Sequence, residues 1–275
     1  MAVLIAFFYV ISPVAEMREK PDETSEIVSQ AYFSEEVKVL ENQGEWSKIQ
    51  TCVDTYPGWV KTASIYYRPD PFAPSVVAKV NRPSVHAYDR QDTVYGSVLT
   101  LPFESQLRVL EPLDTTSTSR WLKVALPNDK ELYIQRGDVE LNPGRISRQE
   151  MCSLSEQFLE LPYTWGGRSS FGYDCSGFVQ MLYRQMGVFL PRDSKDQVKS
   201  SLFVETSLSL LKAGDLIFFG LEQGKIRHVG MYLGDDQFIH STVAENQPYI
   251  RISQLSSPEW SGGGRFKYRT FRTLA

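Results

Sequence analysis

The spacing of apolar residues after Cys175 predicts an amphipathic helix. Large apolar side chains recur at intervals that place them on one helical face, at Phe178, Val179, Leu182, Tyr183 and Met186. Asp174 is a suitable N-cap residue, and Gly187 is typical of the position just beyond a helix C-terminus. Cys175 therefore falls in the first turn, where the helix dipole and a nearby imidazolium would stabilise a thiolate.

Three short runs of β-branched and aromatic residues, 215–220, 228–234 and 237–242, predict a meander of β-strands. His228 begins the second run, and His240 lies 12 residues later (240 − 228), in the third. Neighbouring antiparallel strands bring such positions side by side on one face. A thiol at the start of a helix and two imidazoles on a sheet are the residue types of thiol catalysis, which needs a nucleophile, a base and a group that orients the base.

The first 142 residues contain an internal repeat. A Val-Leu-Glu segment, a strand that begins with Trp and a further strand follow one another twice, at 39–41, 46–49 and 58–61 and again at 109–111, 121–124 and 132–135. The spacing from Trp46 to Trp59 is 13 residues (59 − 46), and from Trp121 to Tyr133 it is 12 (133 − 121). Short alternating strands joined by polar turns predict two small β-barrels, over residues 1–68 and 75–142.

Proline-containing segments mark two boundaries. The segment 68–74 contains three prolines, which favour an extended chain and indicate a short, stiff linker. Asn142-Pro143-Gly144 marks the second boundary, and we expect the third domain to span residues 143–275. Ser147 and Glu150 follow with the spacing of a capping box, which predicts a helix through about Leu161.

Composition indicates a globular protein. The chain has 275 residues, enough for two or three domains, and is 42% hydrophobic, while its net charge of −4 gives no reason to expect nucleic acid as a partner. The apolar run from Ala2 to Ile11 has the length of a signal-peptide core but lacks a basic segment and is too short to cross a bilayer, so we interpret its later part as a strand. Three cysteines form no disulfide framework, which suits a reducing compartment.

In order along the chain, six segments resemble the NlpC family of papain-like cell-wall peptidases: 163–168, 174–178, 191–194, 214–219, 228–234 and 238–240. The resemblance implies an α+β papain-like (NlpC-type) catalytic domain preceded by two small all-β SH3-like barrels. It implies Cys175 as the nucleophile, His228 as the base that activates it, and His240 as the polar residue that orients His228. The family cleaves peptidoglycan stem peptides, usually between γ-D-glutamate and the following diamino acid, and needs no metal or organic cofactor.

The resemblance also implies a pocket for a free N-terminal L-alanine. In relatives with this layout, a tyrosine before a Gly-Trp pair projects from the first SH3-like domain into the active-site cleft, and Tyr56 matches that position. Carboxylates gathered in a partly dehydrated cleft favour a bound ammonium group. The residues expected to line the pocket are Tyr56, Trp165, Asp174, Ser176, Asp193, Ser194 and Glu26. Tyr56 packed on its own barrel, and Asp193 and Ser194 as helix-capping residues, are the ordinary alternatives.

Other interpretations remain open. A cysteine with two histidines could hold zinc, although no close pair of ligands anchors such a site. Isolated cysteines are usually small core residues, which we expect of Cys52 and Cys152, and we expect His86 at the surface. The same scaffold could serve an amidase or acyltransferase, or a non-catalytic protein that binds peptidoglycan.

The expected partners are peptidoglycan-derived peptides, with either meso-diaminopimelate or lysine after the D-glutamate. We expect a monomer that binds no nucleic acid and makes no stable membrane insertion. Its expected location is the cytoplasm, where peptides cut from the wall are recycled, and export to the periplasm or cell wall is the alternative.

Overall fold

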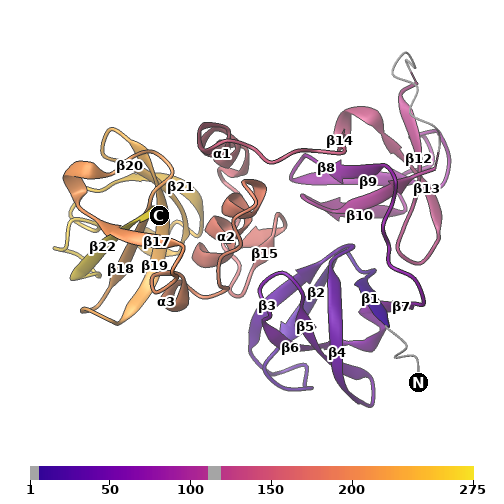
Figure 1. Cartoon of the computed structure of the whole chain (residues 1–275), viewed down its shortest axis with the longest axis horizontal. Helices are drawn as coiled ribbons and strands as arrows, with labels where there is room; N and C mark the ends of the chain where they lie inside the picture. Colours follow the sequence, from indigo (N-terminus) through magenta and orange to yellow (C-terminus); the bar gives the residue numbers. More distant parts are fainter. Residues whose placement is uncertain (1–5, 111–118) are drawn as a thin grey trace. The chain divides into compact units, whose positions relative to one another are not determined.

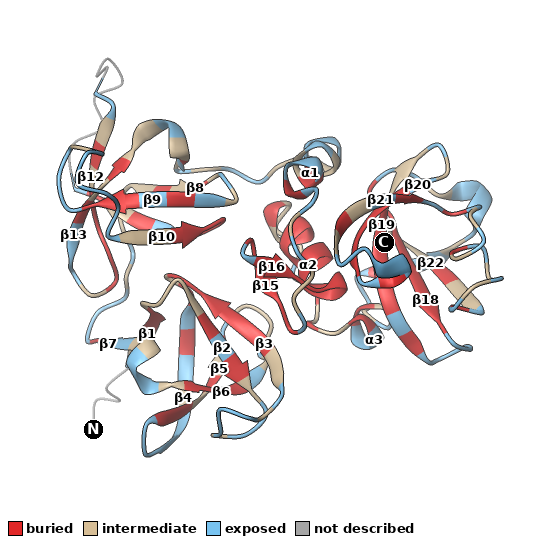
Figure 2. Ribbon diagram, turned by 180° about the vertical axis from the view of Figure 1, so that it is seen from behind, coloured by how far each residue is buried: buried red, intermediate tan, exposed pale blue. Residues whose placement is uncertain are grey.

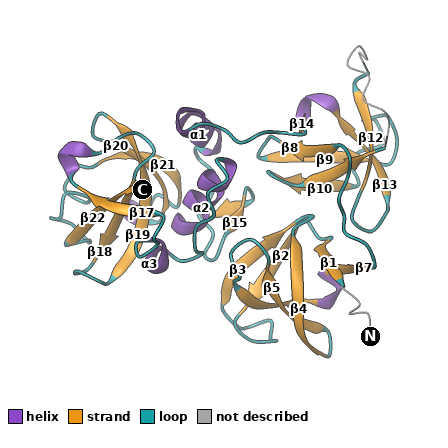
Figure 3. Ribbon diagram, in the orientation of Figure 1, coloured by secondary structure: helices purple, strands orange, loops and turns teal. Residues whose placement is uncertain are grey.

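The computed structural model describes residues 6–110 and 119–275 and forms two compact units (Figure 1). The first comprises Met1–Gly144 with Ser169–Phe171, and the second comprises Arg145–Arg168 with Gly172–Ala275. Ala2–Ile5 of the apolar run and Glu111 of the repeat lie outside the described residues. Strands are the main regular element of both units, and the α-helices belong to the second (Figure 3).

Two seven-stranded antiparallel sheets make up the first unit. The strands of the first sheet are β1 (Phe7–Val10), β2 (Val14–Arg18), β3 (Ile27–Tyr32), β4 (Glu36–Gln43), β5 (Trp46–Thr51), β6 (Pro57–Lys61) and β7 (Ile65–Arg68). Those of the second are β8 (Val77–Val80), β9 (Ser84–Tyr88), β10 (Leu99–Pro102), β11 (Gln106–Val109), β12 (Trp121–Ala125), β13 (Glu131–Gln135) and β14 (Val139–Leu141). Short 3₁₀ turns precede the last strand of each sheet, at Thr62–Ser64 and Arg136–Asp138.

The two sheets share one topology. The first has the strand order β3-β2-β6-β5-β4-β1-β7 and the second has β10-β9-β13-β12-β11-β8-β14, so each strand is matched by the strand seven places later. The internal repeat in the sequence is therefore also a repeat of strand order. Phe33, fully buried, packs into the core of the second sheet beside Leu101 and Leu107, and this shared core explains why the two sheets form one unit.

The second unit is built on a six-stranded antiparallel sheet of order β17-β22-β18-β19-β20-β21. Its strands are β17 (Phe203–Thr206), β18 (Leu216–Gly220), β19 (Ile226–Gly234), β20 (Gln237–Thr242), β21 (Tyr249–Gln254) and β22 (Tyr268–Leu274). A two-stranded hairpin, β15 (Arg168–Ser169) and β16 (Gly172–Tyr173), precedes the main helix. The helices are α1 (Arg148–Ser155), α2 (Cys175–Gln185) and α3 (Ser194–Gln197), with 3₁₀ turns at Glu156–Phe158, Leu208–Leu210 and Ala244–Asn246.

Helix α2 is the buried centre of the second unit. It packs against β19 and β20, and nearly all of it is buried, as is most of the adjoining sheet (Figure 2). Asp174 caps its first turn, because its Oδ1 accepts a hydrogen bond from the Gly177 N–H at 2.7 Å. Gly187, at φ +79°, ends it in a Schellman motif closed by Val188 N–H to Tyr183 O. The predicted helix and both of its caps are confirmed.

Helix α1 begins as predicted but is shorter. Ser147 and Glu150 form the capping box, and the helix then ends at Ser155 with one 3₁₀ turn through Phe158 instead of continuing to Leu161. The buried ring of Phe158 packs edge-on against Tyr173 and Phe178, which turns the chain into the core. Proline at position 162 also disfavours the helical conformation at Leu161. Within residues 6–110 and 119–275, no helix is long and apolar enough to span a membrane.

Candidate active site

Two histidines on neighbouring strands form a hydrogen-bonded pair. Strands β19 and β20 are antiparallel with Met231 opposite Ile239, which places His228 and His240 on the same face. His228 Nε2 and His240 Nδ1 are 2.7 Å apart, and both rings are buried. Gly230 lies beside His240, and a Cβ there would come within 2.7 Å of the Phe238 ring and 3.1 Å of the His240 Cβ. The missing side chain leaves room for Phe238 and His240 at this place.

The Cys175 side chain lies beside the strand that carries His228. Its Sγ accepts hydrogen bonds from the backbone N–H groups of Val229, which follows His228, and of Ser176. His228 Nε2 is engaged by His240, so Nδ1 is the ring nitrogen left for the thiol. If Nδ1 takes the thiol proton, Nε2 carries a hydrogen and donates it to His240. The structure therefore brings Cys175, His228 and His240 together.

Ser253 in β21 extends this chain of contacts. His240 Nε2 lies 3.0 Å from Ser253 Oγ, and the serine is buried. With His240 Nδ1 accepting from His228, Nε2 carries the hydrogen that Ser253 Oγ accepts, which fixes the tautomer of His240. No sequence motif identifies Ser253 as a residue of the site. Its only signal is a polar residue at an inward position of a strand, in a segment for which no strand was predicted.

Aromatic rings surround the two imidazoles. Trp260 lies 5.3 Å from the His228 ring and 4.7 Å from the His240 ring, and Phe266 stacks on His228 at 5.8 Å. Phe238 lies 4.4 Å from His240. Burial in this apolar shell lowers the pKa of His228 from 6.5 to about 3, with help from the positive charges of Arg265 and Arg251. Burial likewise holds the pKa of His240 well below 6.5, so both rings are neutral at pH 7.

The thiol is neutral as well, contrary to the expectation from sequence. Burial, together with the adjacent Asp174 carboxylate, raises the pKa of the Cys175 thiol to about 12, although Arg192 and the two backbone N–H groups lower it. Burial also lowers the pKa of His228, so it gives no support for an imidazolium beside the thiol. His228 is the base placed to take the thiol proton when the sulfur attacks.

Asp174 and Ser176, on either side of the nucleophile, are held by a buried arginine. Arg192 Nη2 donates to Asp174 Oδ2 at 2.6 Å, and Nη1 donates to Asp174 Oδ1 at 3.1 Å and to Ser176 Oγ at 2.9 Å. Ser176 Oγ also donates to Asp174 Oδ1 at 3.1 Å. Arg192 lies in the segment 191–194 that carries the family resemblance, which implies no role for it. A lone arginine between proline and aspartate carries no signal that it will be buried.

The remaining predicted residues fall into two groups. Asp193 is half-buried at the N-cap position of α3 but makes no side-chain capping bond, and its carboxylate lies 3.4 Å from the exposed Lys195. Ser194 is buried, and Trp165 is 64% exposed. Tyr56 and Glu26 belong to the first compact unit, where Tyr56 packs against the core of the first sheet. Their part in the pocket stays a prediction.

Tyr163 is a further residue of the site that was quoted in a motif without a role. Burial raises the pKa of its phenol above the usual value, and the nearby Cys175 and Asp174 act in the same direction. The side chain therefore belongs to the surroundings of the thiol. A phenol that keeps its proton at all working pH values is a hydrogen-bond donor at this position.

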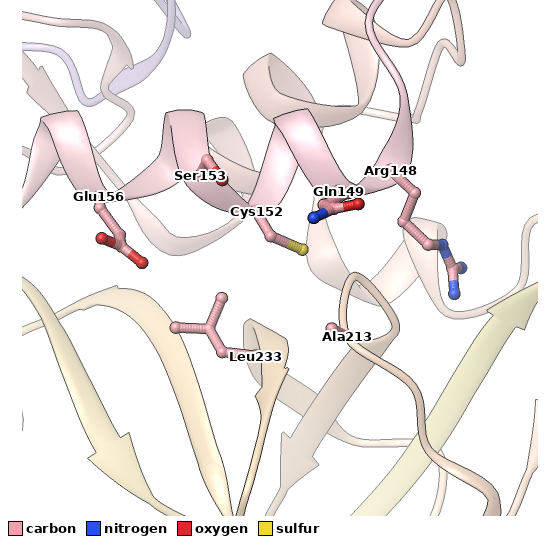
Figure 4. Close-up of a pocket in the computed structure, with 7 residues that line it drawn as sticks. All are labelled: Arg148, Gln149, Cys152, Ser153, Glu156, Ala213 and Leu233. Carbon is pink, nitrogen blue, oxygen red and sulfur yellow. The ribbon is translucent and has the colours of Figure 1, made fainter.

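The other cysteines lie away from the nucleophile. Cys52 is exposed in the turn that follows β5, so the core position predicted for it was wrong, because the inward positions of this strand are Ile49 and Thr51 and the next residue faces outward. Cys152 is only half-buried and faces a pocket of about 470 Å³ (Figure 4). The residues that line this pocket are Arg148, Gln149, Cys152, Ser153, Glu156, Ala213 and Leu233. His86 is exposed, as predicted. Among the described residues, no group of three or more His, Cys, Asp and Glu side chains could hold a metal ion.

Comparison with known proteins matches both parts of the chain. The model of the NlpC/P60 family matches residues 160–263, and that of the bacterial dipeptidyl-peptidase SH3 domain matches residues 17–65. A γ-D-glutamyl-L-lysine dipeptidyl-peptidase of Bacillus cereus is 30% identical over 88% of this chain and 76% of its own length. A protein of the same name from Bacillus subtilis is 30% identical over 78% of this chain and 72% of its own.

A solved structure agrees with the fold. An NlpC/P60 family protein from Bacillus cereus has a TM-score of 0.83 at 24% identity, and the match covers 98% of this chain and 99% of that one. The SH3 model covers the first sheet alone, so the SH3 class of the second sheet and the predicted domain boundaries stay predictions. The thiol and imidazole pair on α2 and β19 is that of a cysteine peptidase. With an SH3 domain in its N-terminal part and this catalytic unit after it, the chain belongs to the NlpC/P60 family of peptidases.

Proposed function

We propose that this peptidase hydrolyses the bond between γ-D-glutamate and the following diamino acid in peptidoglycan stem peptides that carry a free N-terminal L-alanine. Two relatives that match most of the chain are named γ-D-glutamyl-L-lysine dipeptidyl-peptidase, which supports this bond. The observation that carries the proposal is the pair of acidic residues at the nucleophile, Asp174 directly before it and Asp193 beside the arginine that binds Asp174.

The charges of this cluster favour an ammonium group. Arg192 is paired with Asp174 through two hydrogen bonds, whereas Asp193 pairs only with the exposed Lys195, at 3.4 Å. Lys195 is 64% exposed, and an exposed ion pair of this kind contributes little. Arg192 already neutralises Asp174, so Asp193 is the carboxylate whose charge remains for the amine of L-alanine. Tyr56, Glu26 and Trp165 would complete the pocket.

The proposed chemistry follows from the geometry. The Cys175 sulfur attacks the γ-carbonyl carbon of D-glutamate while His228 Nδ1 takes the thiol proton. The Cys175 N–H, which has no acceptor within α2, stabilises the oxyanion at the helix N-terminus. His228 then gives the proton to the departing amine, and the C–N bond breaks to leave a thioester. Water, deprotonated by His228, attacks the thioester and restores the thiol.

A requirement for a free amine restricts the substrate to peptides already cut from the glycan. Recycling of such peptides in the cytoplasm is the setting that we propose, with the periplasm or the wall as the alternative. The test compares L-Ala-γ-D-Glu-L-Lys and the corresponding diaminopimelate peptide with their N-acetylated forms, using product release measured by mass spectrometry.

Acetylation should lower kcat/KM by roughly tenfold to a hundredfold, the effect of losing a hydrogen bond to a charged group. Equal turnover of free and acetylated peptides would exclude the amine pocket. Cys175→Ala should abolish hydrolysis of every peptide while the protein stays folded, and hydrolysis that survives this substitution would exclude the thiol mechanism.

A further inference from the structure

We propose that Arg192 is a positioning residue of the reaction: it supplies the counter-charge that allows Asp174 to stand directly before the nucleophile, and it thereby sets the reactivity of the Cys175 thiol. The inference rests on Cys175 as the nucleophile of the proposed function. It adds a residue that acts through Asp174 and Ser176 and that need not touch the substrate.

The contacts of Arg192 are those of a guanidinium built into the site. It is 2% exposed, binds both carboxylate oxygens of Asp174 and reaches the Ser176 hydroxyl with the same nitrogen that binds Oδ1. A bidentate pair fixes the orientation of a carboxylate as well as its position. Asp174 and Ser176 flank Cys175, so one arginine holds both neighbours of the sulfur-bearing residue.

The chain around Arg192 is itself tied to α2. Gln180 Nε2 donates to the Leu190 carbonyl at 3.0 Å, and Gln197 Nε2 donates to the Pro191 carbonyl at 2.9 Å and to the Ser176 carbonyl at 3.1 Å. Gln180 and Gln197 are both buried. These bonds lie on both sides of Arg192 along the chain. These hydrogen bonds hold the segment around Arg192 against α2 and so fix the position of its guanidinium.

The charges near the thiol indicate how Arg192 affects the stability of the Cys175 thiolate. The Asp174 carboxylate disfavours the thiolate and Arg192 favours it, and these are the two charges that act on Cys175 most strongly. Tyr163 and His228, which also face the thiol, are neutral. The other charged groups of the surroundings act one step away: Asp193 and Arg168 on Arg192, and Arg251 and Arg265 on His228. Removing Arg192 would leave a buried carboxylate directly beside the attacking sulfur.

Alkylation of the thiol tests this role without any peptide. All variants are made in a Cys52→Ser/Cys152→Ser background, so that Cys175 is the one thiol that reacts with iodoacetamide. The variants are Arg192→Met, Arg192→Lys, Asp174→Asn and the double variant Asp174→Asn/Arg192→Met. Arg148→Met is the matched control, because it breaks an arginine–aspartate pair in the same unit, with Asp215 at 2.9 Å, away from Cys175.

An uncompensated neighbouring charge shifts a pKa by about 1–3 units. Because a less acidic thiol is also a better nucleophile, Arg192→Met should slow alkylation at pH 8 by roughly threefold to thirtyfold. The double variant, in which both charges are gone, should recover most of the lost rate, and Arg192→Lys should keep the rate but lower kcat/KM because lysine cannot bind both carboxylate oxygens. Arg148→Met should react at the unaltered rate.

Near-ultraviolet circular dichroism establishes that each variant is folded. Unaltered alkylation in folded Arg192→Met, or a double variant as slow as the single one, would overturn the charge-balancing role. If Arg192→Met does not fold, Asp174→Asn decides, because Arg192 then acts on the thiol unopposed and alkylation must become faster; an unaltered rate would equally overturn the inference. A failure to cleave the peptide would leave these rates unaffected, so the two proposals fail separately.

Discussion

Gly177 of α2 lies against the backbone of Gly167 with no space for a side chain. A Cβ on Gly177 would lie 2.2 Å from the Gly167 carbonyl oxygen, which also accepts a hydrogen bond from the Asp174 N–H at 3.0 Å. The contact is between backbones, so no side-chain rotation could relieve it. This close approach fixes the start of α2, and with it Cys175, against the segment that leads into β15.

Gly177→Ala should therefore both destabilise the protein and impair catalysis. Overpacking of this kind costs about 1–3 kcal/mol, and the shift of α2 that relieves it moves Cys175 relative to His228. The check is the free energy of unfolding in urea together with kcat. Gly137→Ala is the matched control, since nothing lies within 4 Å of its Cβ position, and it should leave both quantities unaltered. A fully active Gly177→Ala would show that the helix start tolerates displacement.

His240 and Ser253 should contribute to kcat in graded amounts. His240→Ala leaves His228 Nε2 buried without its partner, which costs about 1–3 kcal/mol and corresponds to a fall in kcat of roughly fivefold to a hundredfold with KM little altered. Ser253→Ala removes a neutral hydrogen bond one step further away, so its loss should be about tenfold or less. A Ser253→Ala variant as slow as His240→Ala would contradict the expectation that the effect on kcat falls with distance from His228.

Stability should fall in acid because of the buried imidazoles. The pKa of His228 is about 3 in the folded protein against 6.5 for an unperturbed imidazole, so the unfolded state takes up the proton first. The free energy of unfolding contributed by His228 is present in full above about pH 6.5 and is lost as the pH falls towards 3. Urea unfolding from pH 7 to pH 4 measures the slope.

His228→Gln removes one such group and should flatten this pH dependence, since glutamine does not titrate. His86→Gln is the control, because His86 is exposed and should leave the slope unaltered. An equal slope in wild type and His228→Gln would mean that other groups account for the loss of stability in acid.

Local signals in the sequence predict the helix and strands that carry Cys175, His228 and His240. The caps at Asp174 and Gly187 and the apolar spacing between them define α2, and the spacing of His228 and His240 needs only one hairpin to bring them together. The contacts that the sequence does not predict depend on packing between segments far apart in the chain. Arg192 reaches Asp174 across 18 residues and Ser253 reaches His240 across 13, and nothing in their immediate neighbours distinguishes them from surface residues.

Packing between distant segments also explains why two predictions were wrong. The pattern after Ser147 predicts a helix through Leu161, but the Phe158 ring packs against Tyr173 and Phe178 and the helix ends earlier. The lowered pKa expected for Cys175 assumed that only the helix dipole and a charge would act. Burial is a property of the assembled fold, and it is the largest influence on the thiol and raises its pKa.

The neutral state of the buried site also bears on how the enzyme survives between turnovers. The thiolate form of cysteine is the one that attacks peroxides and disulfides, and the access of these oxidants falls with burial. Burial raises the pKa of the Cys175 thiol and leaves the residue 9% exposed, and both effects slow its oxidation. The same burial that makes the thiol a weaker acid therefore protects the nucleophile between turnovers.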